Sequence, residues 1–238
     1  MAASPASQPH SAEGSTPRRT PARWWRALRF TAVAAAALVT VVAGQHLLAR
    51  PDCTSFDAAA MGRLEAEMWR DYYTRRWGRL GIGLLRAACG QHGFSWWDGA
   101  RVAAHAGRAA VLFRVDTDDP ACLSELERYY RIVAPALECR FDPAEAARLE
   151  LTWWQERRRE VPPRDYARTI ARLTALLYGI PEADALPACL LRAEAMAYRD
   201  ARRSRGMTEA DWAEVQRLLT AAHSELRARL DSRRAPTE

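Results

Sequence analysis

Residues 30–49 read FTAVAAAALVTVVAGQHLLA, twenty residues without an aspartate, glutamate, lysine or arginine. A helix of this length extends about 30 Å at 1.5 Å per residue, which matches the hydrocarbon thickness of a bilayer. No other stretch of the chain is both as long and as free of charge. The segment therefore predicts a helix that spans a membrane and contacts lipid along residues 30–49.

The residues before this segment predict its orientation. Residues 1–29 contain five arginines and a single acid, Glu13. Arginines that precede an apolar span stay on the cytoplasmic side, because their transfer through the bilayer is costly. We expect a disordered, arginine-containing cytoplasmic tail at residues 1–22, a signal-anchor helix at 23–50 and an extracytoplasmic domain at 51–238, in the inner (plasma) membrane. The residues expected at the membrane interface are Trp24, Trp25, Arg26 and Arg29.

Two other interpretations of the segment remain open. Val41-Val42-Ala43 resembles the cleavage site of a secretory signal peptide, and a cleaved signal would also export the domain. A buried helix around residues 34–37 of a soluble protein fits less well, because the polar face of such a helix is missing. The long tail and the twenty-residue length favour the uncleaved anchor.

The net charge of +6 is concentrated before residue 30. The tail contributes +4, whereas residues 30–238 contain 30 arginines against 28 acids, a balance of +2. A domain this close to neutrality lacks the basic surface that binds phosphates, so we expect no nucleic-acid partner.

The five cysteines are scattered through the chain, at Cys53, Cys89, Cys122, Cys139 and Cys189. They form no C-x-x-C pair and have no histidine at metal-ligand spacing, and the glycine motifs of phosphate binding are absent, so we expect no metal and no cofactor. In an oxidising compartment the last four could form one or two disulfides, whose pairing the sequence leaves open. Cys53 either links two copies of the chain or is a small, partly buried thiol.

Helix signals recur from residue 56 onward, whereas β-branched alternation is nearly absent, so we predict an all-α domain, an irregular bundle of about seven helices. The clearest start is Asp142-Pro143, where a capping side chain precedes a proline at the first helical position. Ser95 and Thr208 predict two further caps, and Ser55 is a candidate for the first helix. The expected helices cover about residues 56–89, 95–114, 120–137, 142–160, 163–178, 184–203 and 208–230.

Helical periodicity places two carboxylates, Glu150 and Glu194, among apolar neighbours. Burial raises the pKa of a carboxylate, which is how enzymes obtain a general acid or base. Both are therefore candidate catalytic residues, while a structural pairing with arginine or tyrosine is the more common use of a buried carboxylate. His92, His105 and His223 have no nucleophile at an interpretable spacing, and His105 is expected on a solvated helix face.

Tryptophan beside arginine is the composition of a protein-binding hot spot. Adjacent residues of a helix point about 100° apart, so one member of each pair, Trp96–Trp97 and Trp153–Trp154, is expected to be exposed. The candidate binding residues are Trp97, Trp153, Arg157 and Tyr198. The alternative is that the aromatic residues all pack in the core.

The sequence thus favours a membrane-anchored scaffold or adaptor whose helical domain binds another protein or a second copy of itself. The alternative is an enzyme or small-ligand-binding bundle that uses the buried carboxylates Glu150 and Glu194.

Overall fold

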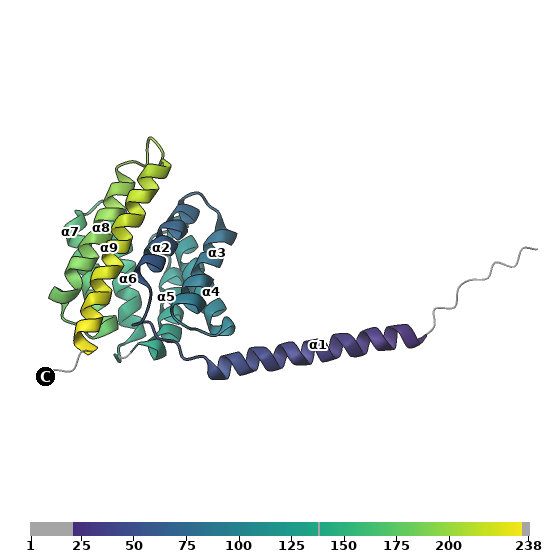
Figure 1. Ribbon diagram of the computed structural model, residues 1–238. Helices are drawn as coiled ribbons and strands as arrows, with labels where there is room; N and C mark the ends of the chain where they lie inside the picture. The colour runs from purple at the N-terminus through teal and green to yellow at the C-terminus, as the bar shows by residue number, and fades with distance from the viewer. Residues whose placement is uncertain (1–20, 138, 235–238) are drawn as a thin grey trace, which may run out of the picture. The chain divides into compact units, whose positions relative to one another are not determined.

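The computed structural model describes residues 21–137 and 139–234, with side chains described from residue 29 onward. The predicted disordered tail lies outside these residues except for Pro21 and Ala22, which begin the first helix, and the side chains of Trp24, Trp25 and Arg26 also lie outside them. The described residues form helices and no strand (Figure 1). The all-α prediction is therefore confirmed.

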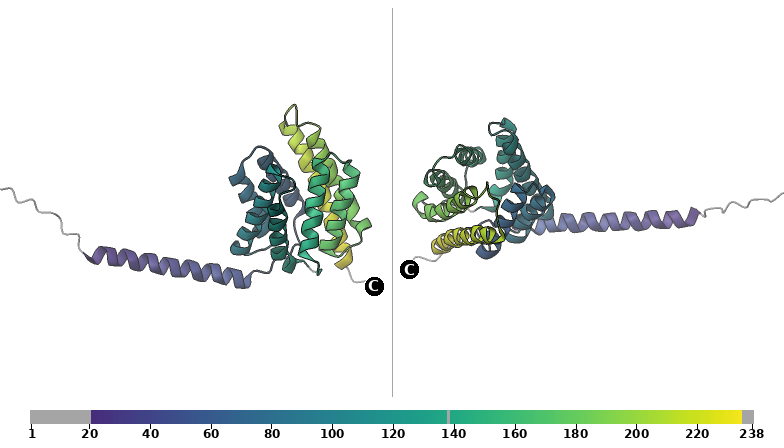
Figure 2. Two further views of the ribbon diagram at one scale, coloured as in Figure 1. Left: turned by 180° about the vertical axis from the view of Figure 1, so that it is seen from behind. Right: turned by 90° about the horizontal axis from the view of Figure 1, so that it is seen from above.

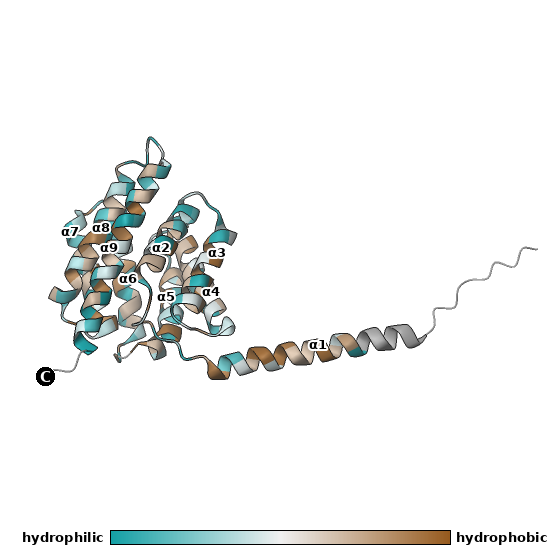
Figure 3. Ribbon diagram, in the orientation of Figure 1, coloured by the Kyte–Doolittle hydropathy of each residue, from teal (hydrophilic) through white to brown (hydrophobic). Residues whose placement is uncertain are grey.

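Helix α1 runs without interruption from Pro21 to Leu48. Its segment Arg29–Leu48 is long and apolar enough to cross a membrane, and none of this segment is buried. Figure 3 shows the apolar residues along this part of α1. A core helix of a soluble protein would be buried against neighbours, so the exposure of α1 argues against that alternative. The described residues divide into two separate compact units, one that ends at Val41 and one that begins at Val42.

Eight further α-helices follow within the described residues of the second unit. They are α2 (Ala58–Tyr73), α3 (Trp77–Arg86), α4 (Trp96–Val115), α5 (Pro120–Val133), α6 (Pro143–Arg158), α7 (Pro163–Tyr178), α8 (Glu182–Asp200) and α9 (Glu209–Arg234), with a π-helical turn at Ala87–Gln91 and a 3-10 turn at Ala134–Ala136. Each helix packs against the next one in the chain, and α9 packs against α2. The predicted bundle is therefore a closed ring of helices (Figures 1 and 2).

Short polar signals start three of these helices, α4, α6 and α9, where the sequence predicted them. The side chains of Ser95 and Asp142 accept hydrogen bonds from the backbone N–H groups of Asp98 and Ala144. Thr208 Oγ1 accepts from the N–H of Asp211, whose carboxylate accepts from the N–H of Thr208. These contacts satisfy N–H groups that have no partner within the helix.

The first predicted helix, residues 56–89, is wrong in two respects. The helix ends at Tyr73, and Arg75 adopts a left-handed backbone conformation with φ of 59°, so that α3 turns back against α2. Asp57, not Ser55, caps α2 by accepting from the N–H of Ala60. Gly83 allows α3 to approach α2, because a Cβ at this position would lie 2.7 Å from Cγ of Met68. The break adds an eighth helix and turns α3 back into the ring.

All five cysteines are free. Cys53, Cys122 and Cys189 are buried, while Cys89 and Cys139 are partly exposed. The one or two disulfides that the sequence allowed are thus not formed. A link between two copies through Cys53 would need an exposed thiol, and Cys53 is only 6% exposed, which favours its alternative as a buried thiol.

Candidate functional site: the cavity inside the helical ring

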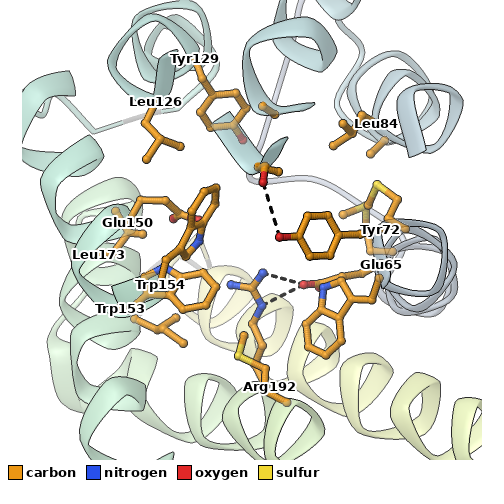
Figure 4. Close-up of a pocket in the computed structure, with 18 of the residues that line it drawn as sticks. Glu65, Tyr72, Leu84, Leu126, Tyr129, Glu150, Trp153, Trp154, Leu173 and Arg192 are labelled. Atoms are coloured by element: carbon orange, nitrogen blue, oxygen red, sulfur yellow. Dashed lines mark hydrogen bonds and ion pairs between the residues drawn. The ribbon is translucent and has the colours of Figure 1, made fainter. Parts of the chain in front are cut away.

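The ring encloses a cavity of about 940 Å³. Every helix from α2 to α9 contributes at least one lining residue. Figure 4 shows side chains from opposite sides of the ring that point toward one another into this space. A cavity arises here because each helix packs mainly on its two neighbours, so that no helix fills the centre.

Most of the lining is apolar and aromatic. Three pairs of adjacent aromatic residues line it, one pair from each of α2, α5 and α6. The pairs are Tyr72–Tyr73, Tyr129–Tyr130 and Trp153–Trp154. Adjacent residues diverge by about 100°, so both members of a pair can reach the same space only when that space is wide. Aromatic walls offer large apolar contact areas together with a polar edge.

A cluster of three residues, Arg192, Glu65 and His223, lies in one wall of the cavity. Arg192 on α8 donates from Nε and Nη2 to Oε1 of Glu65 on α2, at 2.9 and 2.6 Å. His223 on α9 places Nε2 at 2.8 Å from the other oxygen, Oε2. Burial raises the pKa of the Glu65 carboxyl, but Arg192 and His223 more than offset this effect and leave the pKa at about 2. The contacts of Glu65 with Arg192 and His223 therefore connect α2, α8 and α9, and they keep Glu65 ionised.

Arg192 also faces the cavity. Its guanidinium lies over the ring of Trp153, 5.4 Å from the centroid. Among the described residues, Nη1 of Arg192 has no hydrogen-bond acceptor. Figure 4 shows the guanidinium between the indoles of α6 and Glu65. This nitrogen is a positively charged donor that a ligand can reach.

Glu150 lies on the opposite side of the cavity, and both of its carboxylate oxygens accept hydrogen bonds. Its Oε2 accepts from the hydroxyl of Tyr130 at 2.9 Å, and its Oε1 accepts from Nε1 of Trp154 at 2.9 Å. Burial and the Glu150 carboxylate raise the pKa of Tyr130 well above its ordinary value, so that its hydroxyl stays protonated and donates. The carboxylate orders two aromatic side chains of the wall.

Three buried polar atoms of the lining residues lack a partner among the described residues: Nε1 of Trp153, Nδ1 of His92 and Nε of Arg199. Burial lowers the pKa of His92 to about 4, so its imidazole is neutral at neutral pH. Buried polar groups are nearly always hydrogen-bonded in native proteins. Unpaired atoms in the wall of a cavity are therefore consistent with a ligand or water that supplies the missing partner.

One end of the cavity is rich in arginine. The arginines at this mouth are Arg75, Arg114, Arg157, Arg158, Arg199 and Arg203. They lie at the C-terminal ends of α2, α4, α6 and α8, where positive side chains offset the helix dipole. Asp200 binds Arg157 and Arg199, and Glu160 binds Arg203. Arg75, Arg114 and Arg158 form no ion pair with a carboxylate among the described residues.

The structure separates the two carboxylates that the sequence singled out. Glu150 lines the cavity, whereas Glu194 is exposed on the outer surface of α8. The prediction that Glu194 points into apolar surroundings is therefore wrong, and the two carboxylates share no site. The sequence also misplaced His105, since its Nδ1 lies 2.6 Å from the buried carboxylate of Glu125 and not on a solvated face.

The four candidate binding residues do not form one surface. Trp153 is 5% exposed and lines the cavity, while Trp97 is 60% exposed on the outside of the ring. Arg157 donates to Asp200 and Tyr73 at the mouth. Tyr198 donates to Asp211, and Arg202 stacks on its ring. Arg29, the remaining described residue of the predicted interface set, begins the apolar segment of α1.

Sequence analysis missed Glu65, Arg192 and Tyr129 as cavity residues. One signal could have indicated Glu65 and Tyr129: an acid followed within eight residues by two adjacent aromatic residues recurs in α2, α5 and α6. No such signal indicates Arg192 on α8. In α2 and α6 this acid, Glu65 or Glu150, lines the cavity together with its aromatic pair. In α5 the acid, Glu125, faces away and binds His105.

Comparison of the chain with models of known protein families, with curated proteins and with solved structures gave no significant match.

Proposed function

We propose that this protein is a membrane-anchored receptor or carrier of an anionic amphiphile, a molecule with an apolar body and an acidic headgroup. The apolar body occupies the cavity of the ring, and the headgroup lies among the arginines of the mouth. The observation that carries this proposal is the combination of an apolar and aromatic cavity with an arginine-rich mouth in one closed ring.

The size and lining of the cavity support a ligand with a long apolar part. Small-molecule sites commonly measure about 300–1,000 Å³ and are mostly apolar with a few polar groups, and the cavity of about 940 Å³ lies within this range. Burial of roughly 300 Å² of hydrocarbon contributes about 7 kcal/mol before the cost of association. Micromolar affinity corresponds to about 8 kcal/mol, so the headgroup contacts must supply the remainder and offset the cost of association.

The charge of the mouth supports an acidic headgroup. Carboxylate and phosphate are the groups that arginine binds best, through paired N–H donors. Nε of Arg199 is buried and has no partner among the described residues, so a donor is still available at the mouth. Inside the cavity, Nη1 of Arg192 and Nε1 of Trp153 provide a second place for an oxygen of the ligand.

The membrane part of the proposal rests on α1. The arginine-rich residues before the apolar segment support a cytoplasmic N-terminus and a domain outside the cytoplasm, in the inner membrane. A phosphatase that is active only outside the cytoplasm tests this orientation when it is fused to the C-terminus. Activity of a cytosolic reporter at the same position would contradict it.

Ligand binding has more support than the scaffold hypothesis. Trp153 belongs to the cavity wall, and Arg157 and Tyr198 form hydrogen bonds within the domain. The predicted binding residues therefore form no common exposed surface. The acid–base version of the alternative also loses support, because Glu194 lies on the outer surface.

The test measures binding of decanoate, decyl phosphate and decanol to the full chain in nanodiscs, by intrinsic tryptophan fluorescence. We expect both anions to bind more tightly than the alcohol. Ala106→Phe fills the cavity from α4 and should abolish binding of all three probes, whereas Ala104→Phe, on the exposed face of the same helix, should not. Arg158→Glu at the mouth should weaken binding of the anions about tenfold and leave decanol unchanged, with Arg164→Glu on the outside as its control.

Two results would contradict the proposal. Equal affinity for decanol and the anions would remove the headgroup argument. Unchanged binding in Ala106→Phe would place the ligand outside the cavity. A preference for decyl phosphate over decanoate, or the reverse, would support the proposal and identify the headgroup.

A further inference from the structure

The exposed pair Trp96 and Trp97 takes no part in the cavity. The two side chains are 57% and 60% exposed at the start of α4, although the sequence predicted that one of them would be buried. Exposure of two adjacent indoles is costly in water, because each leaves a large apolar ring unburied. The site proposed above gives no reason for this exposure.

The pair lies beside the end of the apolar segment of α1. The backbone N–H of Trp96 donates to Oε1 of Gln45 at 3.2 Å. In the next residue of α1, Nδ1 of His46 lies 3.2 Å from Oγ of Ser95 and 3.1 Å from the carboxylate of Asp98. All of these residues belong to the compact unit of residues 42–238. The start of α4 is therefore fixed to the last turn of the candidate membrane span.

We propose that Trp96 and Trp97 insert into the headgroup region of the bilayer that α1 crosses, and hold this end of the ring on the membrane surface. The inference rests on the proposed function in one respect, namely that α1 spans a membrane. Indole rings favour the membrane interface, where the ring contacts acyl chains and the N–H contacts water. Leu47 and Leu48, 81% and 80% exposed, belong to the same last turn of α1 as Gln45 and His46.

Charge beside the pair fits lipid phosphate groups. Arg50 is exposed two residues after the span, and Arg101, one turn after Trp97, is exposed and donates to Asp98 at 3.3 Å. Arginine side chains near an anionic membrane surface strengthen binding to it. The combination of two indoles with flanking arginines is typical of a surface that contacts phospholipid.

This placement determines where the ligand enters. Trp96 and Arg114 lie near opposite ends of α4, about 27 Å apart along the helix axis at 1.5 Å per residue. If the start of α4 rests on the bilayer, the arginine mouth opens away from it. The ligand then enters from the aqueous compartment and not by lateral diffusion out of the membrane.

The experiment uses the full chain in vesicles whose phospholipids carry bromine on the acyl carbons nearest the headgroup, since bromine quenches nearby tryptophan. The double variant Trp96→Phe/Trp97→Phe keeps two apolar rings in place but removes their fluorescence. Trp77→Phe, an exposed tryptophan at the other end of the ring, is the matched control. Flotation with the vesicles and a thermal melt establish that each variant is anchored and folded.

We expect the double variant to lose roughly half of the bromine-quenched fluorescence, because Trp24 and Trp25 are expected to provide the rest at the other interface. The Trp77→Phe control should lose none. The inference is overturned if the double variant keeps the full quenched signal, or if aqueous iodide quenches Trp96 and Trp97 in the vesicles. A chain that fails to float with vesicles overturns the inference together with the membrane part of the proposed function, whereas decanoate binding without quenching overturns the inference alone.

Discussion

Gly62 of α2 and Thr220 of α9 lie in direct backbone contact, and this contact closes the ring. A Cβ on Gly62 would lie 2.6 Å from both Cα and N of Thr220. Such distances involve backbone atoms, so a side chain at position 62 cannot be accommodated by rotation of a neighbouring side chain. The cavity depends on this approach, because α2 and α9 are the first and last helices of the ring.

Gly62→Ala should therefore destabilise the domain. Forcing α2 away from α9 costs about 1–3 kcal/mol, more than the gain in helix propensity from alanine. Urea unfolding measures the change. The control is Gly81→Ala in α3, where no atom lies within 4 Å of the new Cβ and alanine should stabilise the helix by roughly 0.5–1 kcal/mol. A variant at position 62 as stable as the one at position 81 would contradict the contact.

Glu65→Gln should lower the free energy of unfolding at neutral pH and change it little in acid. Loss of the carboxylate leaves Arg192 without its partner, which costs about 3–5 kcal/mol. In the wild type the folded pKa of about 2 lies below the ordinary value of 4.5, so this contribution is complete above pH 4.5 and is lost as the pH falls toward 2. The difference in unfolding free energy between the wild type and Glu65→Gln should therefore decrease as the pH falls from 4.5 toward 2.

Chemical denaturation of Glu65→Gln at several pH values makes this measurement. Glu67→Gln, two residues further along α2 on the exposed face, is the matched control and should follow the wild type at every pH. A constant difference between Glu65→Gln and the wild type from pH 7 to pH 2 would show that Glu65 is not ionised by its partners.

The cysteines should differ sharply in reactivity. Burial raises the pKa of Cys53 to about 12 and that of Cys122 to about 11, so neither forms a thiolate at neutral pH. Cys139, which is partly exposed, should react first with N-ethylmaleimide in the native chain. Mass spectrometry should find five labels in denaturant without a reductant. Fewer labels under those conditions would reveal a disulfide.

Local signals in the sequence were sufficient for most helix boundaries. Asp142 and Ser95 cap helices because their side chains reach N–H groups two or three residues ahead, an interaction that needs no tertiary contact. The break at Arg75 was missed, because the left-handed backbone occurs at a residue other than glycine. The sequence gives no local signal for such a turn.

Ring closure and the cavity depend on contacts between distant residues. Gly62 and Thr220 are 158 positions apart, and no periodic pattern joins them. The orientation of α8 was misjudged for a related reason: this helix is rich in alanine on several faces, so the contrast between its sides is weak. Arg192, rather than Glu194, is the charged residue that faces inward, between Cys189 and Met196 of the buried stripe.

Glu150 and Glu194 provide a final matched comparison. Glu150→Ala removes the acceptor of two donors, the hydroxyl of Tyr130 and Nε1 of Trp154, and each buried donor left unpaired costs about 1–3 kcal/mol. Glu194→Ala, on the exposed side of α8, should change the free energy of unfolding by no more than about 0.5 kcal/mol. Glu150→Gln keeps one carbonyl acceptor, so its stability should fall between those of Glu150→Ala and the wild type. Urea unfolding of the three variants measures this order, and equal effects of the two alanine substitutions would mean that Glu150 does not order the cavity wall.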